Sequence, residues 1–262
     1  TVSKPVPQGP WRPVTEMDYT RRSYRQGLCP AGMKAFTVTV KETDLWLAVD
    51  SSAMTPDLPG KVEQFVWGKR RLLERYISEE PAFLQALEPY VAAPGAPAIA
   101  LDMVRAGNMA GVGPMAAVAG AFAQYVGEWL LQLTSQVIVE NGGDIFLCCN
   151  RPVKVGIFAG ESPFNEKLAI RIAPREEPRG ICTSSGSVGP SYSRGRADAA
   201  VILAKSAILA DAVATAAANM VQSQEDLQRA AKFAGEIKGV EGALVILGDK
   251  LAAWGEIELQ GI

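Results

Sequence analysis

The chain has 262 residues, of which 48% are hydrophobic and 21% are charged, so it can close a substantial core as one large or two small domains. Its formal net charge of −2 gives no electrostatic reason to expect nucleic acid or an anionic membrane surface as a partner. Histidine is absent, which excludes Ser/His/Asp and Cys/His catalytic groups and imidazole metal ligands. Any chemistry must use carboxylates, hydroxyls, Lys, Arg, backbone amides or a hard metal ion.

The cysteine pattern and the hydropathy together predict a cytoplasmic protein without a membrane span. The four cysteines form neither a C-x-x-C pair nor a ladder of metal ligands, which favours reduced thiols. No run of about 18 uninterrupted apolar residues occurs, and the first residues lack the charged-then-apolar order of a signal peptide.

An extended, proline-rich arm is expected over residues 1–30, followed by a single domain over 31–262. Residues 35–50 alternate β-branched residues with others and predict two strands that meet at a KETD turn. Apolar spacing predicts a helix over 55–77, whose basic cluster around Arg70 is expected to be a solvated face. A second short helix is expected to begin at a Ser78 cap.

The remaining elements are predicted from the same patterns of apolar residues and turn residues. In chain order they are a strand at 97–104, a loop at 105–113, a small-residue helix at 114–133, strands at 134–140 and 144–149, short strands at 154–160 and 167–173, a Ser/Gly loop at 181–196, a strand at 197–204, helices at 206–222 and 223–236, and a hairpin at 243–259.

A weak internal repeat relates two of these helices. Shifting the sequence by about 95 positions aligns residues 116–126 with residues 211–221, which suggests a duplicated strand and helix. The alternative is that alanine bias alone produces the match. Ala116 and Gly120 stand where the second copy has Asp211 and Thr215, so only the second copy carries polar groups there.

The stretch LADAVATA contains the first candidate site. Side chains four residues apart on a helix lie on one face, about 6 Å apart, so Asp211 and Thr215 can point at one object. A carboxylate and a hydroxyl suit a hard cation such as Mg²⁺. The alternative is structural, because an aspartate in a first turn complements the helix dipole and a threonine hydroxyl can bond to the preceding turn.

Two loops are further candidates. Glycine-rich backbone with hydroxyls and a guanidinium can cradle a phosphate, although a plain surface loop is the alternative. The residues of the Ser/Gly loop that could do so are Thr183, Ser184, Ser185, Gly186, Ser187 and Arg194.

The segment ENGGDI places Asn141, Gly142, Gly143 and Asp144 between two strands. A tight hairpin turn explains it first, but the glycines also let a ligand ring approach the backbone, with Asp144 accepting from an N–H group.

In this order, VIVENGGDI, CTSSGS and LADAVATA resemble the ApbE superfamily, the FAD:protein FMN transferases and their uncharacterised relatives. KETDLWL and GPMAAVAGAFAQYV look like a smaller uncharacterised branch, so the resemblance spans nearly the whole chain. The resemblance implies an α+β fold, an elaborated T-fold in which an antiparallel sheet is layered with helices. It also implies FAD and magnesium.

The resemblance assigns roles to matching positions. It implies that Asp211 and Thr215 are Mg²⁺ ligands, that Gly142, Gly143 and Asp144 lie near the flavin, and that the TSG-like segment is Ser184, Ser185 and Gly186. The implied activity is transfer of the FMN phosphoryl group to a protein hydroxyl, or hydrolysis of FAD to FMN and AMP.

Two departures separate this chain from the flavin transferases. The flavin transferases carry a histidine-containing HxxxP segment where this chain reads SYSRGRADAA. They also carry a lysine in an AKG-like element where this chain has Ala119 and Gly120. One alternative is therefore a protein that binds a nucleotide-like small molecule without turnover. Another is an assembly role, including a homo-oligomer, because helices of small residues can pack closely against neighbours.

Overall fold

The computed structural model describes residues 29–185 and 195–262, so almost all of the expected arm at 1–30 lies outside the described residues. Its centre is an eight-stranded sheet in which every neighbouring pair is antiparallel. The strands are, in spatial order, β1 (Met33–Val40), β2 (Thr43–Asp50), β3 (Val137–Asn141), β4 (Asp144–Cys149), β7 (Arg175–Ser184), β8 (Ala199–Ala204), β9 (Val240–Leu247) and β10 (Lys250–Gly255).

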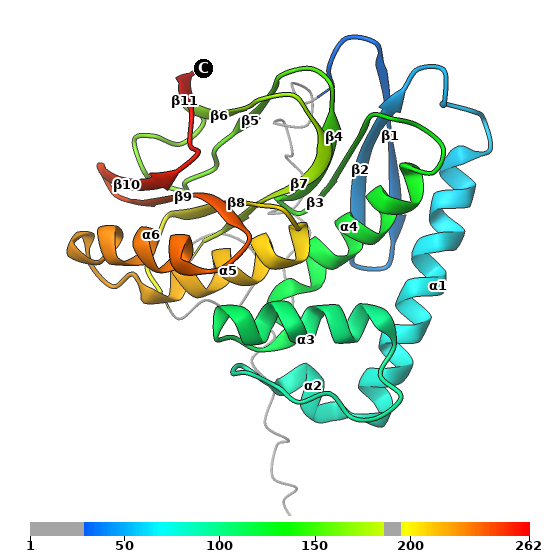
Figure 1. Ribbon diagram of the computed structural model, residues 1–262, viewed down its shortest axis with the longest axis horizontal. Helices are drawn as coiled ribbons and strands as arrows, with labels where there is room; N and C mark the ends of the chain where they lie inside the picture. Colours follow the sequence, from blue (N-terminus) through cyan, green and yellow to red (C-terminus); the bar gives the residue numbers. More distant parts are fainter. Residues whose placement is uncertain (1–28, 186–194) are drawn as a thin grey trace, which may run out of the picture.

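Helices cover one face of this sheet, and a small three-stranded sheet covers the other (Figure 1). The helical elements are α1 (Leu58–Glu79), α2 (Pro81–Gln85), α3 (Ala98–Ala110), the 3-10 turn η2 (Pro114–Ala117), α4 (Val118–Leu130), α5 (Ala207–Met220), the 3-10 turn η3 (Gln224–Asp226) and α6 (Leu227–Glu236). The small sheet has the order β11 (Leu259–Gly261), β6 (Leu168–Ile172) and β5 (Val153–Gly156).

Strand β3 is buried on both faces, which explains why it begins with three apolar residues in succession. Val137 and Val139 face the core beneath the helices, whereas Ile138 faces the core beneath the small sheet. Successive side chains of a strand point to opposite faces, so a strand with cover on both sides favours apolar residues without alternation. This layered arrangement confirms the α+β prediction.

The order of elements repeats along the chain. The pair β1–β2 is followed by helices and the hairpin β3–β4, and the pair β7–β8 is likewise followed by helices and the hairpin β9–β10. The element before α4 is a helix, however, while the element before α5 is a strand. The strand expected before the first copy of the repeat is therefore a helix, and the internal duplication suggested by residues 116–126 and 211–221 stays a prediction.

The strand expected at 97–104 and the loop expected at 105–113 are wrong, because most of this stretch is α3. Ile99, Met103, Ala106 and Ala110 are buried at spacings of three and four residues. That is the period of a helix whose one face meets the core. Gly111, with φ of 75°, ends the helix in the left-handed conformation that glycine tolerates.

Two other expectations also change. The loop expected to begin at 181 starts only after β7, which runs through Ser184. Ser78 does not begin a helix: it lies inside α1, and its hydroxyl donates to the carbonyl of Arg75. By contrast, the helix expected from Ser223 is confirmed with a capping box formed by Ser223 and Asp226.

Within the described ranges, no single helix is long and apolar enough to cross a membrane. Helix α3 and residues 114–130 reach that length only as a pair, and the pair is bent by 103°.

Helix α4 reaches the sheet so closely that Gly127 cannot carry a side chain. A Cβ at Gly127 would lie 2.0 Å from Cδ1 of Phe146, a buried residue of β4. We expect Gly127→Ala to lower the free energy of unfolding by roughly 1–3 kcal/mol, because the ring or the helix must shift. Gly68→Ala in α1 is the matched control, since nothing lies within 4 Å of its added Cβ.

Urea denaturation of both variants checks this prediction. We expect Gly68→Ala to raise the free energy of unfolding by roughly 0.5–1 kcal/mol, since alanine favours the helix. Equal effects of the two substitutions would contradict the close packing of α4 on β4.

Candidate functional site

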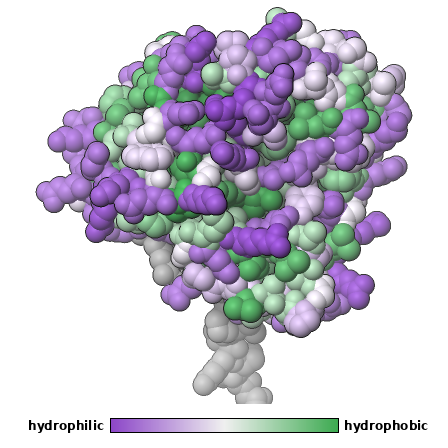
Figure 2. All heavy atoms as spheres, in the orientation of Figure 1, coloured by the Kyte–Doolittle hydropathy of each residue, from purple (hydrophilic) through white to green (hydrophobic). Residues whose placement is uncertain are grey.

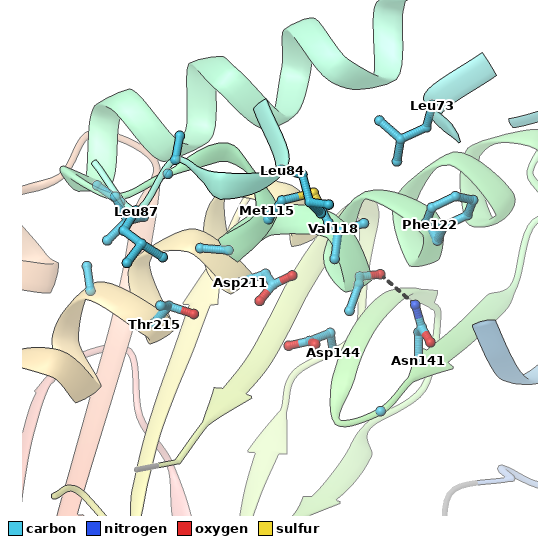
Figure 3. A pocket seen from close by; sticks show the side chains of 18 of the residues that line it. Leu73, Leu84, Leu87, Met115, Val118, Phe122, Asn141, Asp144, Asp211 and Thr215 are labelled. Carbon is cyan, nitrogen blue, oxygen red and sulfur yellow. Dashed lines mark hydrogen bonds between the residues drawn. The ribbon is translucent and has the colours of Figure 1, made fainter. Parts of the chain in front are cut away.

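A cavity of about 1250 Å³ lies where α1, η2, α4 and α5 meet the β3–β4 turn. Residues 81–93, called here the roof segment, contribute α2 and Ala86–Glu88 to its wall. Figure 3 shows the polar site residues below and the apolar residues above them. The apolar wall includes Leu73, Leu84, Leu87, Met115, Val118 and Phe122.

The roof segment is tied to the helices around it. The backbone N–H of Tyr90 donates to Oδ1 of Asn108 at 2.8 Å, and Nδ2 of Asn108 donates back to the carbonyl of Tyr90 at 3.0 Å. The N–H of Ala93 donates to the hydroxyl of Tyr76 at 3.1 Å. A Cβ at Gly113 would lie 1.8 Å from the carbonyl oxygen of Ala86, so backbone meets backbone there.

The β3–β4 turn forms the floor of the cavity at its polar end. Asn141 pairs with Asp144 across the hairpin, and Gly142 and Gly143 have φ of 66° and 103°. Glycine takes up positive φ values at low cost, so the tight hairpin expected at ENGGDI is confirmed, with Gly142 and Gly143 rather than Asn141 and Gly142 at its centre. The turn places Asn141, Gly142 and Asp144 in the cavity lining.

Helix α5 presents Asp211 and Thr215 to the same cavity (Figure 3). Ser206 caps this helix by accepting a hydrogen bond from the N–H of Leu209. Asp211 is only 8% exposed, and its Oδ2 accepts a hydrogen bond of 2.8 Å from the N–H of Gly120. Gly120 lies in the first turn of α4, whose amides have no carbonyl partner within the helix. Asp211 therefore stabilises the start of α4 while it lines the cavity.

The two aspartates are buried acids that repel one another. Burial raises the pKa of Asp144 well above its ordinary value, and the neighbouring Asp211 carboxylate raises it further. Burial also raises the pKa of Asp211 to about 7, although hydrogen bonds from the Gly120 and Ala119 amides oppose this. Oδ1 of Asp144 is buried without a hydrogen-bond partner. Protons or a cation would remove this cost.

The end of β7 brings the predicted phosphate loop beside the β3–β4 turn. Cys182 pairs with Asp144, and a Cβ added at Gly143 would lie 3.9 Å from the carbonyl oxygen of Thr183. The hydroxyl of Ser184 is buried without a hydrogen-bond partner. Thr183, Ser184 and Ser185 are nevertheless not among the described residues that line the cavity. Gly186, Ser187 and Arg194 lie outside the described residues.

The opposite end of the cavity holds residues that the sequence did not suggest. The guanidinium of Arg70 bonds to Glu42, Thr43 and Glu74, and its side chain is only 14% exposed. The expectation that this arginine belongs to a solvated face is therefore wrong. The contact spans 28 residues between α1 and the β1–β2 turn, so the helical pattern could not reveal it. Lys41 of the same turn pairs with Glu74 at 2.7 Å.

A family model described as AbpE bacteria matches residues 26–250 of the chain. The chain belongs to this family. The chain is 40% identical to a UPF0280 protein of Methanosarcina acetivorans over 220 residues, 83% of this chain and 85% of the relative. It is 37% identical to the UPF0280 protein of Methanocaldococcus jannaschii over 225 residues, 84% of this chain and 90% of the relative.

Solved structures extend the likeness to the ApbE flavin transferases. The flavin transferase ApbE from Vibrio cholerae matches with a TM-score of 0.55 at 15% identity, covering 86% of this chain and 97% of that chain. The ApbE protein of Thermotoga maritima matches with a TM-score of 0.54 at 14% identity, with the same coverage. At this identity the likeness shows the fold, and with the family match it confirms the ApbE-like resemblance.

Because the pKa of Asp211 is raised, we expect this protein, when free of metal, to lose stability as the pH rises. The folded pKa is about 7, whereas an unfolded aspartate titrates near 4. The folded state therefore binds the proton more tightly than the unfolded state does. The resulting contribution of Asp211 to the free energy of unfolding is complete below about pH 4 and is lost as the pH rises through about 7. Asp144, whose pKa is also raised, acts in the same direction.

Melting temperatures measured in EDTA between roughly pH 5 and pH 8 check this prediction. We expect the wild type to melt lower at the higher pH and Asp211→Asn to show a flatter profile. Asp249→Asn, which changes an exposed turn residue outside the cavity lining, should keep the wild-type profile. An unchanged profile in Asp211→Asn would contradict the buried-acid assignment.

Proposed function

We propose that the cavity binds a flavin nucleotide such as FAD together with Mg²⁺ held by Asp211 and Thr215. The observation that carries this proposal is the pair of buried aspartates, Asp144 and Asp211, which line one cavity. Two buried carboxylates without a cationic partner are costly, and a bound cation offsets that cost. The flavin is favoured by the fold that the chain shares with the ApbE flavin transferase from Vibrio cholerae.

The side chains present fit a hard cation. Asp211 and Thr215 supply a carboxylate and a hydroxyl one helical turn apart. The described residues hold no cluster of three His, Cys, Asp or Glu side chains that could bind a metal alone. This agrees with Mg²⁺, which takes one or two protein carboxylates and completes its shell with waters and substrate phosphates.

The rest of the cavity suits the remainder of such a ligand. The apolar wall of α1, α2 and α4 excludes water from a planar ring, since it presents Leu73, Leu84 and Phe122. Asp144 can accept a hydrogen bond from a ring N–H with its unpartnered oxygen. A magnesium ion at Asp211 would supply positive charge to neutralise the pyrophosphate.

The protein's own groups limit the chemistry that can follow binding. Lys41 and Arg70 are the basic residues in the described lining, and carboxylates hold both of them. Since Asp211 would hold the cation, Asp144 is the carboxylate of the described lining at the polar end that can accept a proton. With such a base, hydrolysis would add one water across the FAD pyrophosphate and yield FMN and AMP. Transfer would instead join the FMN phosphoryl group to a protein hydroxyl and also release AMP.

Binding without turnover is the second candidate, because the chain has no histidine to serve as base. An assembly role or homo-oligomer stays a prediction. Figure 2 shows hydrophobic side chains interspersed among hydrophilic ones on one face of the molecule. Leu87 and Val91 of the roof segment and Leu101 and Met109 of α3 are exposed. The predicted cytoplasmic location also stays a prediction.

Titration of FAD into the protein by fluorescence, with Mg²⁺ and with EDTA, tests the proposal. We expect Mg²⁺ to strengthen FAD binding, because it joins the ligand phosphates to Asp211. Asp211→Asn should remove this enhancement, since it removes the charged ligand. Asp249→Asn should bind as the wild type does.

Chromatography of the same mixtures separates the candidate reactions. AMP released together with free FMN indicates hydrolysis, AMP released with FMN bound to protein indicates transfer, and no AMP indicates binding alone. A wild type that binds no FAD in the presence of Mg²⁺ would refute the proposed function.

A further inference from the structure

One peptide group at the polar end of the cavity is held from both sides. Nδ2 of Asn141 donates to the carbonyl of Ala119 at 3.0 Å, and Oδ2 of Asp211 accepts from the N–H of Gly120 at 2.8 Å. The carbonyl of Ala119 and the N–H of Gly120 belong to the same peptide bond. Figure 3 draws the bond from Asn141 beside the two aspartates.

We infer that Asn141 is a positioning residue that orients Asp211 for cation binding through the Ala119–Gly120 peptide. This inference rests on the proposed function, because it concerns the same carboxylate. A peptide group is planar, so its C=O and N–H directions cannot vary independently. A hydrogen bond that fixes the carbonyl of Ala119 therefore also aims the N–H of Gly120 at Asp211.

The three elements that meet here are far apart in the sequence. Asn141 ends β3, the peptide lies in the first turn of α4, and Asp211 lies in α5, 91 residues from Gly120. Asn141 and Asp211 are 8% exposed, so water does not compete freely for these hydrogen bonds. The unit therefore links the turn that carries Asp144 to the helix that carries Thr215.

Gly120 is what allows the unit to form. A Cβ at this position would lie 2.3 Å from the carbonyl oxygen of Ala207 and 2.8 Å from Cβ of Asp211. Any side chain would push α4 away from α5, and the N–H would no longer reach the carboxylate. Gly120 thus permits the close approach of two helices.

This role differs from the one predicted for Asn141 from the sequence, which was direct contact with the ligand. Asn141 does line the cavity, but its amide nitrogen is engaged by the backbone of α4. A ligand-contacting residue would change FAD affinity with or without a metal. A positioning residue would act only through Asp211, and a double-mutant cycle separates the two.

The first experiment measures Mn²⁺ binding by electron paramagnetic resonance in the wild type, Asn141→Ala, Asp211→Asn and the double variant. We expect Asn141→Ala to weaken Mn²⁺ binding by roughly 10- to 100-fold, as for other residues that orient a metal ligand. In the Asp211→Asn background the Asn141 substitution should add no further loss. Equal losses in both backgrounds would overturn the inference.

The second experiment does not depend on any ligand. Hydrogen exchange of the Gly120 amide, followed by NMR in metal-free protein, reports on its bond to Asp211. We expect the Gly120 amide to exchange about tenfold faster in Asn141→Ala, because a tenfold change corresponds to the free energy of about one buried hydrogen bond. Unchanged exchange would overturn the inference, because the peptide would then be oriented without Asn141.

Asn165→Ala is the matched control, since it also removes one side chain bond to the backbone, at Ala159, outside the cavity lining. It should change neither Mn²⁺ affinity nor Gly120 exchange. If Asn141→Ala does not fold, Asn141→Ser, which keeps a small polar side chain too short for this bond, replaces it. If the wild type binds no Mn²⁺, both the cation site and the role of Asn141 at that site are refuted. If the wild type binds Mn²⁺ but exchange of the Gly120 amide is unchanged in Asn141→Ala, only the inference about Asn141 is refuted.

Discussion

The burial of two acids at one end of the sheet is the constraint on which the arrangement of the cavity depends. Asp144 stands at the start of β4 and Asp211 in α5, and both lie almost wholly out of solvent. Burial of a carboxylate is tolerated only where donors, protons or cations compensate it. The α4 amides compensate Asp211 in part, whereas one oxygen of Asp144 has no hydrogen-bond partner. The two buried carboxyl groups are thus incompletely compensated by the protein, and a cation bound in the cavity would stabilise their charged forms.

The helical layer positions these acids because small residues let it approach the sheet. Gly127 lies on the ring of Phe146, and Gly180 of β7 lies so close to Ala207 that an added Cβ would be 2.3 Å from its Cα. Alanines and glycines in α4 and α5 bury little area individually, but they bring backbone groups within reach of side chains. The alanine-rich composition of these helices therefore serves the site as well as the core.

Local signals in the sequence predicted local structure well. The two glycines of ENGGDI predicted the hairpin, and Ser223 predicted a helix start, because each feature is decided within a few residues. Asp211 and Thr215 were identified by their spacing and do share a cavity. The stretch at 97–104 failed because its apolar residues satisfy either period over so short a window, and only the core contacts of α3 decide. The partners of Asp211 and Arg70 could not be predicted, since they come from distant segments.

The roof segment is fastened to α1 and α3, through Tyr76 and Asn108, rather than to the sheet that carries Asp144. The apolar wall draws on this segment together with α1, η2 and α4, whereas the acids come from β4 and α5. A substitution in the roof segment would therefore reshape the apolar wall while the acids keep their places.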